Sequence, residues 1–360
     1  MSASDVKDLA PRKRARRATQ RLTMADVAKA AGVSASTVSL YFRRPEAVSP
    51  HLAERVKTVI DEMGYVPNLM AGSLAAAKSR TVAVILPSIV NSFYAETYNT
   101  LQRLFSASNY QTLLGVSEFS PDSEEKLIRA FLAWSPAAMV VTGLQHTPQA
   151  KAMLASSGIP IIEMWDMPTP ENEAVDTSVG FSHFEVGRQQ ASHLYDQGCR
   201  KIAYIGAAVH LDMRVRSRAD GYEDEVERRG LHQPVALTAP DAASTPVGCW
   251  LFDEVLTAHP DIDGIVCSND TLALGVLFEA KRRNIRVPED LTVIGFGDLT
   301  FSNSCLPPLT TVRPPQQEIG RLAATHILAR LAGASLQPSH YNLDCQVIVR
   351  DSTQGPRHPA

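Results

Sequence analysis

Apolar side chains recur every three or four residues in three short segments near the start of the chain, a spacing typical of helices with one buried face. The first segment begins after Thr23, a residue type that caps helices well, has Asp26 in its first turn, and ends at Gly32. The second segment begins at Ser34, and the third covers about residues 50–63. Three helices with a glycine in the first turn predict a helix–turn–helix unit, whose second helix would enter a DNA major groove.

The stretch "YVPNLMAGSLAAAKSRT" follows this unit. Pro67 ends the preceding helix, and the alanine-rich segment after it predicts a short helix that is marginally stable alone in water. A helix that forms only when something stabilises it suits a switch. Residues 1–20 are polar and basic and are predicted to form a disordered arm.

From Val82 the pattern changes to short apolar runs separated by segments of helical periodicity. These runs predict the strands of parallel sheets with crossover helices; they are "VAVILP", "YQTLLGV", "AAMVVTG", "IPIIEMW", "KIAYIGA", "DGIVCSN" and "LTVIGFG". The fold class is therefore α/β, with a small all-α head and a body of two lobes. A ligand would bind between the lobes, at the carboxyl ends of the strands.

The predicted organisation has five parts. They are a basic arm (1–20), the helix–turn–helix unit (21–67), a hinge helix (68–80), the body (81–350) and a tail (351–360). Within the body, one lobe comprises about 81–180 with 313–345, and the other comprises 181–312.

Charge is distributed unevenly along the chain. Residues 1–80 contain 14 Lys and Arg against 7 Asp and Glu, whereas the remainder contains 21 against 31. A basic head on an acidic body indicates that the head meets a polyanion. A solvated basic tail is the alternative interpretation, because the run "RKRARR" (Arg12–Arg17) contributes much of the charge.

Several classes of protein are excluded by what the sequence lacks. No apolar run reaches 18 residues and no secretory signal segment is visible, which predicts a cytoplasmic location without membrane contact. Five scattered cysteines without a CxxC pair argue against a zinc site or a disulfide framework. No P-loop, GxSxG or HExxH pattern occurs, so we expect no enzyme, no metal and no cofactor.

Four motifs in this order resemble the LacI/GalR family of bacterial transcriptional regulators over about residues 21–350. They are "TMADVAKAAGVSASTVS", "GYVPNLMAGSLA", "SNDTLALG" followed by "VPEDLTVIGFGD", and "PPLTTV". The stretches "LPSIVNSFYAE", "NYQTLLG", "QHTPQA", "SGIPIIEMWD" and "VGFSHFEVGRQ" resemble the gluconate-operon repressor branch of that family. The resemblance implies a homodimer, or a dimer of dimers, that binds a pseudo-palindromic operator under control of a small effector.

The resemblance also implies which residues bind DNA. Ala35, Ser36 and Thr37 match the family's positions that face bases and phosphates, and Thr23 is a further candidate. Small hydroxyl and methyl groups read bases only at close approach. Leu74 matches the hinge leucine that wedges between base steps in the minor groove. Capping of the second helix is the alternative role of Ser36 and Thr37, and hinge-to-hinge packing is that of Leu74.

Effector-binding candidates lie at predicted strand ends and in the segment "RVRSRADGYEDE". The candidates are Asn91, Phe93, Tyr94, Trp165, Arg214, Arg218, Asp270 and Asp298, with Asp166 and Phe181 as further possibilities. Alternatives stay open: Asp270 could cap the following helix, Trp165 could be a core residue, and the arginines could form a solvated face.

Arg214, Arg216 and Arg218 crowd one segment, which favours an anionic ligand. Together with the branch resemblance, this predicts a repressor that responds to gluconate or 2-ketogluconate. The alternatives are a neutral sugar or a nucleobase as effector, or a transport-type sugar-binding protein. No leucine-heptad tail follows "VIVRDST", so we expect a dimer rather than a tetramer. The sign of the response and the operator sequence do not follow from the residues.

Overall fold

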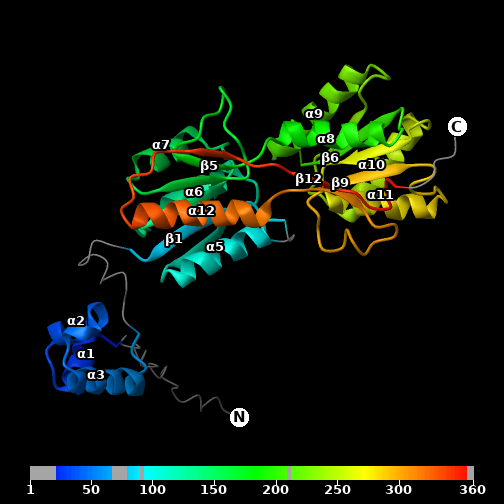
Figure 1. The fold of residues 1–360 in the computed structure, drawn as a ribbon. Coiled ribbons are helices and arrows are strands. Elements are labelled where there is room, and N and C mark those ends of the chain that lie inside the picture. Colours follow the sequence, from blue (N-terminus) through cyan, green and yellow to red (C-terminus); the bar gives the residue numbers. More distant parts are fainter. Residues whose placement is uncertain (1–21, 67–78, 90–92, 209–211, 355–360) are drawn as a thin grey trace, which may run out of the picture. The chain divides into compact units, whose positions relative to one another are not determined.

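The computed structural model describes residues 22–66, 79–89, 93–208 and 212–354. The chain divides into two compact units, Met1–Ala77 and Lys78–Ala360 (Figure 1). The predicted basic arm and all but the last two residues of the predicted hinge segment lie outside the described residues.

The head is a three-helix unit built as the apolar spacing predicts. It comprises α1 (Met24–Ala31), α2 (Ala35–Arg43), a single 3-10 turn (Pro45–Ala47) and α3 (Pro50–Met63). Its core is small and is formed by one apolar face of each helix; the buried members are Val27, Ala28, Ala31, Val38, Val56 and Tyr65. Gly32 ends α1 in the left-handed conformation, which glycine adopts without a steric penalty. From α3, the Arg55 side chain donates to the Gly32 carbonyl at 3.1 Å and ties this turn to the third helix.

The first lobe of the body is a six-stranded parallel sheet in the order β11-β5-β4-β3-β1-β2 (Figure 1). Its strands are β1 (Thr81–Leu86), β2 (Gln111–Val116), β3 (Ala138–Thr142), β4 (Ile161–Met164), β5 (Thr177–Gly180) and β11 (His340–Asn342). Helices α5 (Ala95–Ala107) and α12 (Gln316–Leu331) cover one face. Helices α6 (Pro121–Ala133) and α7 (Pro148–Ser156) cover the other.

The second lobe repeats this architecture with the strand order β12-β10-β9-β8-β6-β7. Its strands are β6 (Ile202–Ala207), β7 (Ala236–Ala239), β8 (Gly264–Cys267), β9 (Thr292–Phe296), β10 (Thr310–Arg313) and β12 (Gln346–Ile348). Only the β10–β12 pair is antiparallel among the described strands. Helices α8 (His183–Asp196) and α9 (Met213–Arg229) pack together, as do α10 (Thr245–Ala258) and α11 (Asp270–Arg282).

The strands are apolar on both faces because helices cover both. In β1, Val82, Val84 and Leu86 join the core cluster that includes residues of α5 and α12. Ala83 and Ile85 point the other way, into the cluster that includes residues of α6 and α7. This explains the continuous apolar runs that predicted parallel strands. The seven runs correspond to β1, β2, β3, β4, β6, β8 and β9, whereas β5, β7, β10, β11 and β12 had no such run.

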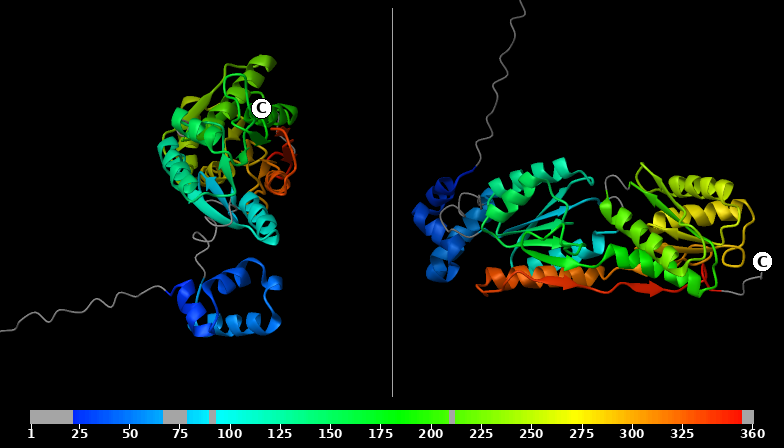
Figure 2. Two further views of the ribbon diagram at one scale, coloured as in Figure 1. Left: turned by 90° about the vertical axis from the view of Figure 1, so that its left-hand side faces the viewer. Right: turned by 90° about the horizontal axis from the view of Figure 1, so that it is seen from above.

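The chain passes between the lobes three times, after β5, after β10 and after β11 (Figure 2). After the last passage, the first residues of the predicted tail (351–360) pack into the second lobe. Ser352 and Thr353 are buried in the second lobe, where the Ser352 hydroxyl donates to the Val293 carbonyl at 2.7 Å and accepts from the Thr310 amide at 2.8 Å. Residues 351–354 therefore belong to the lobe because their polar groups complete its edge, and residues 355–360 lie outside the described part.

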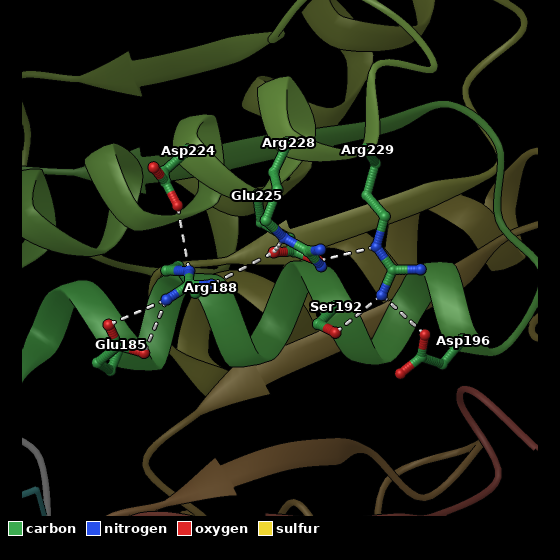
Figure 3. Close-up of polar contacts among 8 residues, drawn as sticks. All are labelled: Glu185, Arg188, Ser192, Asp196, Asp224, Glu225, Arg228 and Arg229. Carbon is green, nitrogen blue, oxygen red and sulfur yellow. Dashed lines mark hydrogen bonds and ion pairs between the residues drawn. The ribbon is translucent and has the colours of Figure 1, made fainter.

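Helices α8 and α9 approach so closely that two glycines are required at their contact. A Cβ atom on Gly187 would lie 2.0 Å from the Arg218 carbonyl oxygen, and one on Gly221 would lie 1.9 Å from that of Phe184. An ionic network joins the same helices (Figure 3). The buried Glu225 carboxylate accepts from Arg228 and Arg229 at 2.5–2.9 Å, and Arg229 also reaches Asp196 at 2.9 Å. The two helices are therefore held together both by this close packing and by ion pairs.

No helix within the described ranges has both the length and the apolar character needed to cross a membrane.

Candidate functional site

The start of α2 presents the head's candidate DNA-contacting residues. Ala35 and Ser36 are exposed and Thr37 is half-buried. Ser34 caps the helix, as predicted, by accepting from the Thr37 amide at 3.1 Å. Its hydroxyl also lies 2.7 Å from that of Ser36 and 2.8 Å from that of Thr37. The three hydroxyls thus form one cluster at the positive end of a helix, where phosphate oxygens bind well.

Thr23 forms a capping box at the start of α1. Its hydroxyl accepts from the Asp26 amide at 3.3 Å, and the Asp26 carboxylate accepts from the Thr23 amide at 2.8 Å and from its hydroxyl at 2.7 Å. These hydrogen bonds hold the pKa of Asp26 below its usual value. The Thr23 hydroxyl proton is committed to Asp26, so a contact with DNA would use another atom of this residue.

We expect Thr23→Ala to destabilise the head by about 1 kcal/mol, the usual cost of a lost N-cap. Native-state hydrogen exchange at the amides of α1 in the full-length chain measures this loss. Thr23→Ser keeps the hydroxyl and serves as the control. Equal protection in the alanine and serine variants would contradict a capping role.

In the body, a cavity lies where the first lobe meets the start of α9. It has a volume of about 60 Å³ and adjoins a larger hollow of about 320 Å³, with which it shares Gln145, Asp166, Met213 and Arg214. Gly143 and Gln145 follow β3, Asp166 follows β4, and Asp212 caps α9. These are the carboxyl ends of parallel strands and a helix start, as the sequence predicts for a ligand site. Gly180 of β5 permits the geometry, because a Cβ there would lie 2.4 Å from the Asp166 carbonyl oxygen.

Arg214 carries the positive charge of this cavity. Its Nε donates to Asp212 at 2.8 Å, while its Nη1 lies 3.8 Å from Asp166 and has no hydrogen-bond partner among the described residues. Burial is the largest single effect and acts to raise the pKa of Asp166 and of Asp212, but Arg214 together with the neighbouring cations and hydrogen-bond donors outweighs it, so both pKa values lie below the usual range. Around Arg214 the site therefore places two ionised carboxylates, Asp166 and Asp212, and a guanidinium whose Nη1 donor is unpaired among the described residues.

Arg218 lies one helical turn further along α9 but contacts the interior. Its Nη1 donates to His183 Nδ1 at 2.7 Å, and its guanidinium stacks on Phe296, 4.5 Å from the ring centre. An arginine only donates, so His183 must carry its hydrogen on Nε2, which donates to the Trp165 carbonyl at 2.9 Å. Burial lowers the pKa of His183, in agreement with a neutral ring. Arg218 thus positions His183 and Phe296 next to the site without lining the cavity itself.

The predicted aromatic residues gather in one cluster. Phe93, Tyr94 and Trp165 pack with ring centres 4.9–5.3 Å apart, and Phe93 also meets Phe296 of the second lobe at 5.3 Å. Phe181 joins the cluster and lines the larger hollow. Trp165 is fully buried with φ at +74°, and its Nε1 has no hydrogen-bond partner among the described residues. Trp165 is therefore a core residue in this state, the alternative that the sequence left open.

Asp270 is not among the residues that line the cavity. Its carboxylate accepts from the Thr311 hydroxyl at 2.6 Å, the Ser302 hydroxyl at 2.7 Å and the Leu299 amide at 2.8 Å, and the residue is fully buried. Asn269, not Asp270, caps α11. Neither role weighed for Asp270 is therefore seen; its carboxylate instead fastens the loop after β9 to β10.

Asp298 and Arg216 also lie outside the cavity. Asp298 forms ion pairs with Arg313 at 2.6 Å and Arg350 at 2.7 Å, and so links the loop after β9 to the end of β10 and to the segment after β12. Arg216 is exposed and pairs with Asp220 one turn along α9 at 2.8 Å, which is the solvated-face alternative for this arginine. Asn91 and Leu74 lie outside the described residues, and their predicted roles stay predictions.

Most residues that line the cavity were not predicted from the sequence, and Asp212, Gln145 and Glu124 are among them. Asp212 stands two residues before the arginine segment, and a helix-capping signal there could have indicated it. Gln145 follows the run "AAMVVTG", so its place at a strand end was a usable signal. Glu124 lies inside a helix of ordinary amphipathic pattern, and no signal in the sequence marked it.

Comparison with known proteins identifies both parts of the chain. Residues 23–68 match the model of bacterial regulatory proteins of the lacI family, and residues 191–353 match a periplasmic binding protein-like domain. The HTH-type transcriptional regulator GntR of Pseudomonas aeruginosa is 37% identical over 338 residues, which cover 94% of this chain and 97% of that protein. The chain belongs to the LacI family.

Other members of the family agree over most of the chain. GntR of Escherichia coli K12 is 34% identical and covers 90% of this chain and 96% of its own length. The crystal structure of a LacI-family regulator from Silicibacter pomeroyi superposes with a TM-score of 0.86 at 31% identity, covering 93% of this chain and 100% of that one. The protein is accordingly a DNA-binding transcriptional repressor of the LacI family and not an enzyme, as the sequence predicts.

Proposed function

We propose that this LacI-family repressor binds its operator under control of a sugar acid, gluconate or 2-ketogluconate, that occupies the cavity beside Arg214. The observation that carries the proposal is the set of ionised groups there. A sugar acid has one carboxylate and several hydroxyls. The free Nη1 donor of Arg214 suits the carboxylate, and Asp166 and Asp212 can accept hydroxyls. A nucleobase has no carboxylate to bind the Nη1 donor of Arg214.

Operator recognition is assigned to the exposed start of α2, with Ala35, Ser36 and Thr37 at the bases and phosphates. Leu74 is proposed to wedge into the minor groove. The protein is proposed to act in the bacterial cytoplasm, on the nucleoid, as a homodimer. Two half-exposed aromatic side chains, Trp250 and Phe278, line a shared groove between α10 and α11, and exposed apolar grooves are typical of interfaces.

Isothermal titration of the purified chain with gluconate, 2-ketogluconate and ribose tests the effector. We expect saturable heat with one of the acids and none with ribose. Binding of ribose in preference to both acids would contradict the proposal and favour a neutral-sugar effector. Operator binding is then measured by fluorescence anisotropy with and without the bound acid. A change in operator affinity is required, since an effector acts only by binding one state more tightly.

A further inference from the structure

Three charged side chains, Glu124, His146 and Glu163, form a buried triad that extends from the cavity into the first lobe. Glu124 of α6 accepts from His146 Nδ1 at 2.5 Å, and His146 Nε2 faces Glu163 of β4 at 3.3 Å. The side chains of His146 and Glu163 are fully buried, and that of Glu124 is 9% exposed. Nothing in operator binding or in the contacts of Arg214 uses this triad.

His146 carries a positive charge in this environment. Burial opposes the charge, but the hydrogen bond to Glu124 and the nearby Glu163 carboxylate together outweigh it and raise the pKa of His146 to about 9. Each ring nitrogen then has a hydrogen to direct at a carboxylate. The His146 ring thus holds the Glu124 carboxylate in place through a hydrogen bond.

Glu163 fixes the far end of the triad. Its other carboxylate oxygen accepts from the Val175 amide at 2.7 Å and the Asp176 amide at 3.4 Å. Glu163 itself lies within β4, between strands β3 and β5. The position of the His146 ring, and through it that of Glu124, is therefore set by the central sheet of the lobe.

The near end of the triad is a wall of the cavity. Glu124 lines it together with Asp166, Asp212 and Arg214. Three carboxylates face a single guanidinium there, so the cavity offers more acceptors than its own arginine can satisfy. A buried ion pair is a weak source of stability compared with apolar residues of the same volume. A charged triad ending at a cavity therefore points to a ligand that supplies donors.

We propose that Glu124 is a specificity-determining contact that accepts a hydroxyl of the bound polyhydroxy acid, and that His146 and Glu163 are positioning residues acting through it. The inference rests on the proposed function, because it assigns the hydroxyl-bearing part of the effector to the first-lobe wall. The inference also predicts weak binding by an acid that lacks a hydroxyl on the carbon that faces Glu124.

Glu124→Gln tests the contact, and Asp122→Asn, at an exposed position two residues earlier, is the matched control. With gluconate and 2-ketogluconate as probes in isothermal titration, we expect the glutamine variant to weaken the acid that binds by about 10- to 100-fold. The asparagine variant should match the wild type. Glu124→Asp keeps the negative charge but shortens the side chain, so the carboxylate lies further from the ligand. This variant gives a second measurement if the glutamine variant folds poorly.

Monodeoxy gluconates identify the hydroxyl. The ratio of wild-type to Glu124→Gln affinity should fall toward one for the single analogue that lacks the hydroxyl bound by Glu124, and stay large for the others. For the positioning role, His146→Gln is measured alone and in the Glu124→Gln background. If His146 acts through Glu124, its substitution costs affinity only while Glu124 is present.

The outcomes separate this inference from the proposed function. Wild-type protein that binds neither acid overturns both. Wild-type protein that binds an acid, with unchanged affinity in folded Glu124→Gln and Glu124→Asp, overturns the contact alone. Additive losses in the double variant overturn the positioning role and leave the contact.

Discussion

Replacing Arg214 by glutamine is expected to weaken sugar-acid binding by at least about 30-fold, the largest effect of any single substitution in the cavity. Removing one partner of a buried, hydrogen-bonded charge pair costs about 2 to 5 kcal/mol. Arg214 is the only arginine or lysine among the residues that line the cavity, and its Nη1 has no hydrogen-bond partner among the described residues. Isothermal titration of the variant with the acid that binds the wild type measures the loss.

Arg216→Gln is the matched control, because it removes the same charge from the same helix at an exposed position. It should leave the dissociation constant within about twofold of the wild type. Arg214→Lys keeps the charge but loses the planar fork, so we expect an intermediate affinity. Equal losses in the Arg214→Gln and Arg216→Gln variants would mean that a diffuse field, and not a contact, attracts the acid.

An acid held at this place would link the two lobes directly. Asp166 belongs to the first lobe and Arg214 to the second, and their nearest charged atoms are 3.8 Å apart without a hydrogen bond. A ligand that satisfies both groups binds one lobe arrangement better than another, which is the condition for a shift in population. The three passages between the lobes are the segments through which such a shift would act.

The fold was largely predictable because its signals are local. The capping positions of Thr23 and Ser34, the end of α1 at Gly32 and the extent of α3 follow from residues within one turn of each boundary. The long apolar runs predicted the central strands. Strands such as β11 and β12 are three residues long and pair with distant partners, so only tertiary contacts define them.

The site was less predictable, because side-chain direction depends on packing across the chain. Arg214 and Arg218 both lie on the inner side of α9, yet only Arg214 lines the cavity. The Arg218 guanidinium instead donates to His183 and stacks on Phe296. Asp270 stands at a strand end, as a ligand-binding carboxylate would, but three donors from later segments satisfy it. Partners so distant in sequence leave no local pattern.

The second large effect is a loss of stability at alkaline pH that depends on His146. The pKa of His146 is about 9 in the folded body and about 6.5 in an unfolded chain, so folding favours the protonated ring. The resulting stabilisation is complete below about pH 6.5 and disappears as the pH rises to about 9. A shift of this size is worth on the order of 3 kcal/mol. Urea unfolding of the full-length chain at intervals between pH 6 and pH 9.5 measures it.

His146→Gln isolates this contribution from other groups that titrate in the same range. Cys305 and Cys345 have pKa values raised by burial, and they also reduce stability as the pH rises. Both chains contain these thiols, so the difference between wild type and variant removes their effect. The difference should be largest near pH 6.5 and close to constant above pH 9. The lowered pKa of His183 affects stability only below about pH 6.5. There the unfolded chain binds a proton on His183 that the folded ring does not bind, so acid lowers the stability of both proteins equally. A wild-type-minus-variant difference that is flat from pH 6.5 to 9 would show that His146 is neutral in the folded protein, and the ionised triad would have to be abandoned.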